Sequence, residues 1–309
     1  MNEALLELYR HKTWATLRLI EHCQGLGDEH LDATIPGTYG TIRDTLRHLV
    51  LSEEGYFMRV TGERSYEHLP EAGPVPMDEL AEHIRRLGPR WEAVAQDPEA
   101  PNREVTTSDG WRLPATVVMA QAIHHADDHR SHVLSILGAR GLQVPVLDVW
   151  AYGESAGQMH LDPSRKFSAT VHTSHGEFVI ALDDPKINPE AVTRFVYLAQ
   201  DNFYDGLTFH RVVPSLVVQG GDRVGNETDG PASELPHKSS PSEWRRGTVG
   251  MKSSEGGTIG SPFFITLSDA AFPETSGVVY HHLGEVSSGM EVVDKIQVGD
   301  AMTIEITAS

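Results

Sequence analysis

The spacing of apolar residues changes once along this chain, and that change limits the possible folds. Up to about residue 150, apolar residues recur every three or four positions, the period of an amphipathic helix. From residue 166 onward, short apolar runs alternate with turn residues, which is typical of strands. The 309 residues suffice for about two domains. We therefore predict a helical domain at 1–153, a linker at 154–165 and a β domain at 166–309.

Composition limits the partners and the compartment. The formal net charge is −19, which argues against binding to nucleic acid or to anionic membranes, because both require clustered cations. Cys23 is the only cysteine, so no intrachain disulfide can form, as expected in a reducing compartment. The N-terminus carries no apolar signal segment and no run is long enough to span a membrane. We expect a cytoplasmic protein.

Four amphipathic segments are predicted in the first half. Thr41 starts the second, with Asp44 as its capping partner, and Pro114 precedes the fourth, which spans Ala115–Leu137. The third has the most regular apolar spacing: Met77, Leu80, Ile84, Leu87, Trp91 and Val94. Four helices of this length predict an all-α four-helix bundle.

Histidines lie on the predicted interior face of the fourth helix. His125 and His129 are one turn apart, so both imidazoles could bind one metal ion, or each could be satisfied by hydrogen bonds. The spacing alone is weak evidence, but His48 on the second helix offers a third ligand. The remaining histidines of this half that we assign to the surface or to helix faces are His11, His22, His30, His68 and His83.

The helical half resembles the DinB-like family of bacterial four-helix bundles. The resemblance lies in Thr41–Phe57, in Gln121–Leu137 and in the segment Pro145–Gly153 that follows. It implies a divalent metal ion, zinc or nickel, bound by His48, His125 and His129. Some relatives are thought to be metal-dependent thiol transferases. A homodimer through the helical bundle is a further expectation.

The second half contains a long signature, Phe203–Asp222, with the turn Tyr204–Leu207 and two short apolar runs. Arg211 is the only charge in the first run; by alternation alone it could simply face solvent. Eight strands are predicted, which indicates a sandwich or a closed barrel: Ser168–Thr173, Glu177–Leu182, Phe209–Val213, Leu216–Val218, Thr248–Met251, Phe263–Leu267, Val278–Leu283 and Thr303–Thr307.

This half resembles the cyclophilin-type peptidyl-prolyl cis-trans isomerases. The motifs Phe-Tyr-Asp-Gly, Phe-His-Arg and Gln-Gly-Gly-Asp occur in family order, followed by Gly247–Met251, Gly260–Ile265 and His282–Val286. The resemblance implies an eight-stranded antiparallel β-barrel with two capping helices, for which Pro189–Leu198 and Glu291–Ile296 are the candidates. It also implies isomerisation of X-Pro bonds in proline-containing polypeptides, a reaction that needs no cofactor.

Four residues are carried over as the centre of that activity. Arg211 would donate to the imide nitrogen, with Gln219 orienting it. Phe264 would form the floor of a slot for the proline ring, and Tyr280 its rim. Phe272 stands where many members place an aromatic residue.

Other positions depart from the family pattern. Leu216 and Val217 replace a bulkier Phe-Met pair, and Pro262 replaces a Gln. Lys252 and Ser253 replace Ala-Asn in the peptide groove, and Ala270–Val279 carries a short insertion. We expect an intact centre with an altered groove.

Three functions follow. The first is a peptidyl-prolyl isomerase fused to a metal-binding bundle. The second is a proline-peptide-binding module without catalysis, next to a structural bundle. The third is a metal-dependent small-thiol transferase with an accessory barrel. Retention of Arg211 favours the first, the loss of Gln at position 262 favours the second, and the complete histidine triad favours the third.

Overall fold

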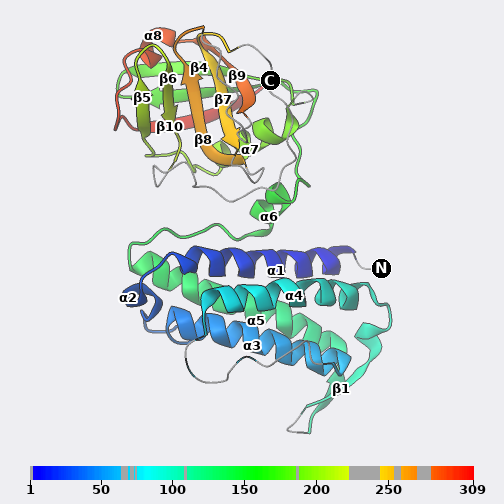
Figure 1. The fold of residues 1–309 in the computed structure, drawn as a ribbon. Coiled ribbons are helices and arrows are strands. Elements are labelled where there is room, and N and C mark those ends of the chain that lie inside the picture. Colours follow the sequence, from blue (N-terminus) through cyan, green and yellow to red (C-terminus); the bar gives the residue numbers. More distant parts are fainter. Residues whose placement is uncertain are drawn as a thin grey trace. The chain divides into compact units, whose positions relative to one another are not determined.

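The chain forms two compact units, Met1–Tyr152 and Gly153–Ser309 (Figure 1). The computed structural model describes residues 3–63, 69, 73, 75–107, 110–185, 188–222, 244–253, 259–269 and 280–309.

The first unit is the predicted four-helix bundle. Its long helices are α1 (Glu3–Gln24), α3 (Ile42–Thr61), α4 (Met77–Gln96) and α5 (Ala115–Ala139). α1 packs along α4 and α3 along α5. Small elements that the sequence did not predict are the helices α2 (Asp28–Leu31) and η1 (Ala100–Asn102), and the antiparallel strands β1 (Glu104–Thr106) and β2 (Arg112–Pro114). A further short helix, α6 (Val149–Ser155), contains the boundary between the two units.

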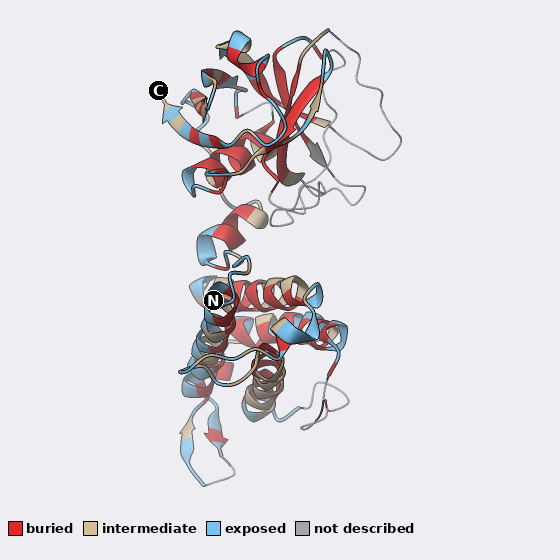
Figure 2. Cartoon of the chain, turned by 90° about the vertical axis from the view of Figure 1, so that its left-hand side faces the viewer, coloured by how far each residue is buried: buried red, intermediate tan, exposed pale blue. Residues whose placement is uncertain are grey.

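Local sequence signals account for the long helices. The Thr41 hydroxyl accepts a hydrogen bond from the Asp44 backbone N–H at 3.0 Å, which confirms the predicted cap of α3. All six apolar residues predicted to line α4 are buried. In Figure 2 the buried faces of the long helices lie on the inside of the bundle.

A buried layer of charge interrupts the apolar core of the bundle. Lys12 of α1 forms an ion pair with Glu53 of α3, and both side chains are almost fully buried. Arg130 of α5 donates to the Lys12 carbonyl at 3.2 Å and to the Thr16 hydroxyl at 2.9 Å. Apolar clusters lie on either side of this layer along α1, one containing Tyr9 and the other Ala15.

Two of the histidines assigned to the surface or to helix faces lie inside the bundle, so that assignment was wrong for them. His11 Nε2 bonds to the Leu147 carbonyl at 2.7 Å, and His83 Nε2 lies 3.5 Å from a Glu54 carboxylate oxygen. His11 and His83 are both buried. Both contact groups come from distant segments of the chain, and helical spacing does not reveal them.

Cys23, on α1, is fully buried in the bundle core, and burial raises the pKa of its thiol to about 12. Within the described part of the chain, none of the helices combines the length and the apolar run needed to cross a bilayer.

The second unit contains an eight-stranded antiparallel sheet in the order β10-β3-β4-β9-β7-β8-β6-β5. Its strands are β3 (Phe167–Thr173), β4 (Gly176–Leu182), β5 (Phe209–Val213), β6 (Val217–Gly220), β7 (Thr248–Ser253), β8 (Ile259–Thr266), β9 (Tyr280–Ser288) and β10 (Met302–Ala308). The sheet curls until its end strands meet: Phe209 N–H donates to the Asp300 carbonyl at 2.9 Å, and Met302 N–H to the Leu207 carbonyl at 2.8 Å. Each of the eight predicted strands therefore has an observed counterpart.

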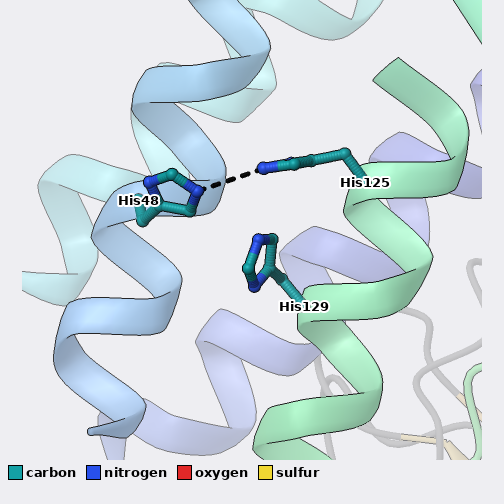
Figure 3. A group of neighbouring side chains, drawn as sticks. All are labelled: His48, His125 and His129. Carbon is teal, nitrogen blue, oxygen red and sulfur yellow. Dashed lines mark hydrogen bonds between the residues drawn. The ribbon is translucent and has the colours of Figure 1, made fainter. Parts of the chain in front are cut away.

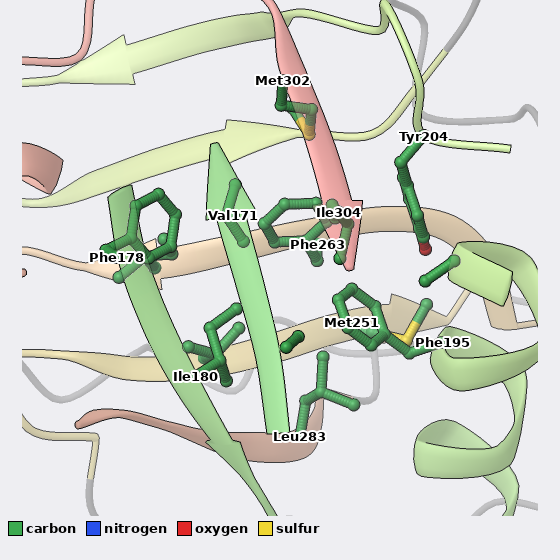
Figure 4. Close-up of a cluster of buried hydrophobic side chains, with 14 of the residues drawn as sticks. Val171, Phe178, Ile180, Phe195, Tyr204, Met251, Phe263, Leu283, Met302 and Ile304 are labelled. Carbon is green, nitrogen blue, oxygen red and sulfur yellow. The ribbon is translucent and has the colours of Figure 1, made fainter. Parts of the chain in front are cut away.

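Two helices accompany the barrel, α7 (Pro189–Gln200) and α8 (Met290–Val293), and Figure 1 shows them at its opposite ends. α8 is shorter than the predicted Glu291–Ile296. The interior is filled by aromatic and aliphatic side chains, among them Phe178, Phe195 and Phe263 (Figure 4). Because strand residues alternate in direction, Phe263 points into this core and its neighbour Phe264 lies in a separate cluster.

Candidate functional site

Three histidines converge in the bundle. His48 comes from α3, and His125 and His129 come from successive turns of α5, so their imidazoles point toward one another (Figure 3). His48 Nε2 lies 3.1 Å from His125 Nε2, and one nitrogen from each of the three rings lies within 4.8 Å of the others. His129 is buried, whereas His48 and His125 are half-buried, so the cluster is open on one side.

Burial keeps these rings neutral. Desolvation, reinforced by the neighbouring His129 and His48, lowers the pKa of His125 to about 4. Desolvation also lowers the pKa of His48 and, with help from His48 and His132, that of His129. Neutral imidazoles with available lone pairs are the form that binds metal ions, so the cluster is in its ligand form at pH 7.

The spacing fits one shared ion. Zinc binds imidazole nitrogen at about 2.0–2.1 Å, so two nitrogens on one tetrahedral zinc ion lie roughly 3.3 Å apart. The observed His48–His125 separation of 3.1 Å is close to that value. Three protein ligands leave positions open for water or a substrate, as in catalytic rather than structural sites.

Aromatic side chains that the sequence did not single out surround the open side. Tyr39 stacks on His48 with ring centroids 4.1 Å apart and meets His129 edge-on at 5.0 Å. The Tyr56 ring meets His125 edge-on at 5.4 Å. Tyr39 is 52% exposed and lies in the loop before α3, where no periodicity constrains it.

A second candidate site crosses the barrel as a row of residues in register. Arg211 of β5 is paired with Gln219 of β6, which is paired with Phe264 of β8. Phe264 is in turn opposite Gly250 of β7, and Gly250 is opposite His282 of β9. Residues directly opposite each other in antiparallel strands share a face of the sheet. Neighbouring strands are about 4.8 Å apart, so Arg211 and Phe264 lie roughly 10 Å apart.

The donor end of this row is polar. Arg211 is exposed, and its Nη1 donates to Gln219 Oε1 at 3.4 Å; within the described residues this is its one hydrogen bond. Gln219 is buried. The guanidinium therefore retains N–H groups for a ligand on the outer face, and the buried amide limits its orientation.

The other end is apolar. Phe264, Val217 and Trp244 form a buried cluster, with Tyr280 packed against it. The Phe264 and Tyr280 rings meet edge-on at 5.6 Å, and the Trp244 and Phe264 rings lie 5.3 Å apart. The row therefore presents a cation and an aromatic wall to the same outer face.

Trp244 and Gly250 are residues that the sequence reading missed. A Cβ atom at Gly250 would lie 2.6 Å from Phe264 Cζ and 2.7 Å from Trp244 Cη2, closer than atoms can approach. The glycine is therefore required by the two rings that pack over it. Beyond it, His282 Nδ1 bonds to Asp183 at 2.6 Å, and the His282 ring lies 5.8 Å from Trp244.

The remaining predicted positions vary in how they relate to this cluster. Val217 belongs to it, whereas Leu216 is 37% exposed and lies outside it. Lys252 and Ser253 lie on β7, and Lys252 is opposite Tyr280 of β9. Phe272 falls outside the described residues.

Comparison with known proteins also divides the chain into two parts, with a boundary at residues 165–168 rather than at the 152–153 boundary of the compact units. The DinB family model matches residues 1–165, and the model described as cyclophilin type peptidyl-prolyl cis-trans isomerase/CLD matches residues 168–307. A peptidyl-prolyl cis-trans isomerase of Helicobacter pylori is 35% identical over 147 residues, covering 46% of this chain and 86% of that protein.

Two further similar proteins are also named as peptidyl-prolyl cis-trans isomerases. Peptidyl-prolyl cis-trans isomerase B of Bacillus subtilis is 38% identical over 120 residues, 38% of this chain and 82% of that protein. A crystal structure of a Cryptosporidium parvum cyclophilin type peptidyl-prolyl cis-trans isomerase aligns with a TM-score of 0.35 and 24% identity, covering 47% of this chain and 98% of that one.

Proposed function

Because the chain belongs to the DinB family over residues 1–165 and to the cyclophilin-type peptidyl-prolyl cis-trans isomerases over residues 168–307, we propose that it isomerises X-Pro bonds in polypeptides and binds one divalent metal ion in its helical bundle. The observation that carries the isomerase proposal is the row Arg211–Gln219–Phe264, which brings a cation and an aromatic surface to one face of the barrel.

The chemistry of the X-Pro bond requires these two features. Amide resonance gives the bond a rotational barrier of roughly 18–20 kcal/mol. A donor aimed at the imide nitrogen localises its lone pair and stabilises the twisted state more than either planar state. Arg211 supplies the donor, and Gln219 holds the guanidinium. Phe264, Val217 and Tyr280 contact the proline ring. Leu216, which is exposed, and Lys252, Ser253 and Phe272 are proposed to contact the flanking peptide.

The test is an isomerisation assay on the full-length chain with a proline-containing peptide. We expect Arg211→Ala to lower kcat/KM about 100-fold or more, the loss found when one transition-state donor is removed. Arg165→Ala, which removes another exposed arginine of the same unit, should keep the wild-type rate. Metal chelation should also leave the rate unchanged, since no step uses a metal.

An Arg211→Ala rate within threefold of wild type would reject Arg211 as the donor. A wild-type chain that binds the peptide without accelerating exchange would instead favour the alternative of a binding module, to which the Pro262 substitution also points.

In the bundle, His48, His125 and His129 are the proposed ligands. Imidazole suits zinc and nickel among the divalent ions, and these are the expected occupants. When bound, such an ion would act as a Lewis acid and lower the pKa of a thiol or water at its open positions. A small-thiol transferase activity is therefore the second candidate function; it is supported by the open side of the cluster next to Tyr39.

Metal analysis of the full-length chain tests the ligand set. Wild-type protein dialysed against zinc should retain about one ion per chain, and His125→Ala should bind it about 100-fold or more weakly, because one of three ligands is gone. His124→Ala is the matched control, since this exposed neighbour on α5 lies outside the triad. Equal zinc retention by the wild type and by His125→Ala would reject the site.

A further inference from the structure

His132 lies one turn beyond His129 on α5, outside the triad. Its Nδ1 is 3.3 Å from His129 Nδ1, and the two ring centroids are 5.3 Å apart with their planes at 69°. His129 is buried and His132 is half-buried. The contact therefore occupies one nitrogen of His129 and leaves Nε2 as the nitrogen available to an ion shared with His48 and His125.

Only one arrangement of protons in this contact is compatible with metal binding. Two lone pairs facing each other at this distance would repel, so one of the two Nδ1 atoms must carry a proton. If His132 carried it, neutral His129 would have its own proton on Nε2, which would block the lone pair that a metal needs. If His129 donates from Nδ1, its Nε2 lone pair is available.

We propose that His132 is a positioning residue: it accepts a hydrogen bond from His129 Nδ1 and so holds His129 in the tautomer, and in the ring orientation, that offers Nε2 to a divalent cation. This inference rests on the proposed metal site. Ligating histidines commonly donate their second N–H to an acceptor that fixes tautomer and orientation, and losing that acceptor weakens metal binding 10–100-fold. Here the acceptor is another imidazole on the same helix.

A second group of ligand atoms includes the same two histidines. Asp128, His129 and His132 offer ligand atoms within 4.8 Å of one another and could bind a cation themselves. His129 cannot serve both sites as a neutral ligand, because Nδ1 carries a proton in one case and a lone pair in the other. The two arrangements therefore predict opposite tautomers of His129.

The experiment compares two nearly isosteric variants of the full-length chain, His132→Asn and His132→Leu. Asn places an amide oxygen about where Nδ1 stood and can accept the hydrogen bond, whereas Leu has a similar shape and no acceptor. Zinc affinity is measured by competition with a chromophoric chelator. Long-range nitrogen–proton NMR of the metal-free protein reports which nitrogen of His129 carries the proton.

We expect His129 to be protonated at Nδ1 in the wild type and in His132→Asn, and to be a mixture of tautomers in His132→Leu. Zinc affinity should fall 10–100-fold in His132→Leu and stay within about threefold of wild type in His132→Asn. A loss in both variants would show that the ring itself is needed, and unchanged affinity in His132→Leu would show that the contact does nothing; either result overturns the proposal.

Three further outcomes distinguish a failure of the metal site from a failure of the role of His132. If the wild type bound no zinc, the triad and the role of His132 would both be rejected. If zinc binding survived His48→Ala and was abolished by His132→Leu, the cation would belong to Asp128, His129 and His132. If it survived His132→Leu and was abolished by His48→Ala, the triad would stand and His132 alone would be excluded.

Discussion

The absence of a side chain at Gly250 allows the aromatic rings of the barrel site to pack together. Gly250 lies opposite Phe264 in register, and the missing side chain leaves the space in which Trp244 and Phe264 meet. The Trp244 ring is buried, so it holds one side of the proposed proline slot in place. A wall of buried, closely packed aromatic rings is preorganised for the twisted state of the substrate, which favours selective binding of that state.

Gly250→Ala should therefore impair catalysis. The added methyl group overlaps two rings, so Phe264 must shift; a displacement on the order of 1 Å can cost up to about 100-fold in rate, and we expect at least a tenfold loss of kcat/KM. Gly138→Ala is the control, because its Cβ would meet only Val144 Cγ2 at 3.6 Å, an ordinary contact. Wild-type kcat/KM in Gly250→Ala would mean that the ring contact does not matter for the reaction.

At the scale of elements, a buried ion pair within the C-terminal unit connects the last turn of α6, through Glu154, to Arg194 of α7. Glu154 and Arg194 are hydrogen-bonded to each other, and both are almost fully buried. Burial raises the pKa of Glu154, and the neighbouring guanidinium opposes this rise. Glu154, the first residue of the linker predicted from sequence, is thus fixed to a barrel helix.

Removing one partner of this pair should destabilise the unit more than removing both. Glu154→Gln removes the carboxylate charge that faces the buried Arg194 cation, and breaking a buried ion pair in this way costs about 3–5 kcal/mol. The double variant Glu154→Leu with Arg194→Leu removes both charges and should be closer to wild type. The urea concentration at which isomerase activity is lost reports the stability of this unit. Equal midpoints for the wild type and Glu154→Gln would contradict a stabilising role.

For the whole molecule, the sequence predicted what depends on local spacing. Apolar periodicity yielded the four long helices and the eight strands, because each buries one face against the rest of its unit. The association of Arg211 with Gln219 is implied by the resemblance to the cyclophilin-type isomerases, and the two residues are opposite each other in β5 and β6. Local spacing does not reveal contacts made across long separations. Three such contacts depend on packing between distant segments. They are the packing of Trp244 over Gly250, the burial of His11 and His83, and the approach of His48 to His125 across 77 positions.

The enclosure of Cys23 has a consequence for chemistry in the bundle. A thiol with a pKa of about 12 and no exposed surface stays protonated and out of reach at neutral pH. The chain therefore has no sulfur nucleophile of its own to present to an ion held by the three imidazoles. Any mercaptan turned over there would have to diffuse in as a separate co-substrate, so the rate of such a reaction should saturate with the concentration of that compound.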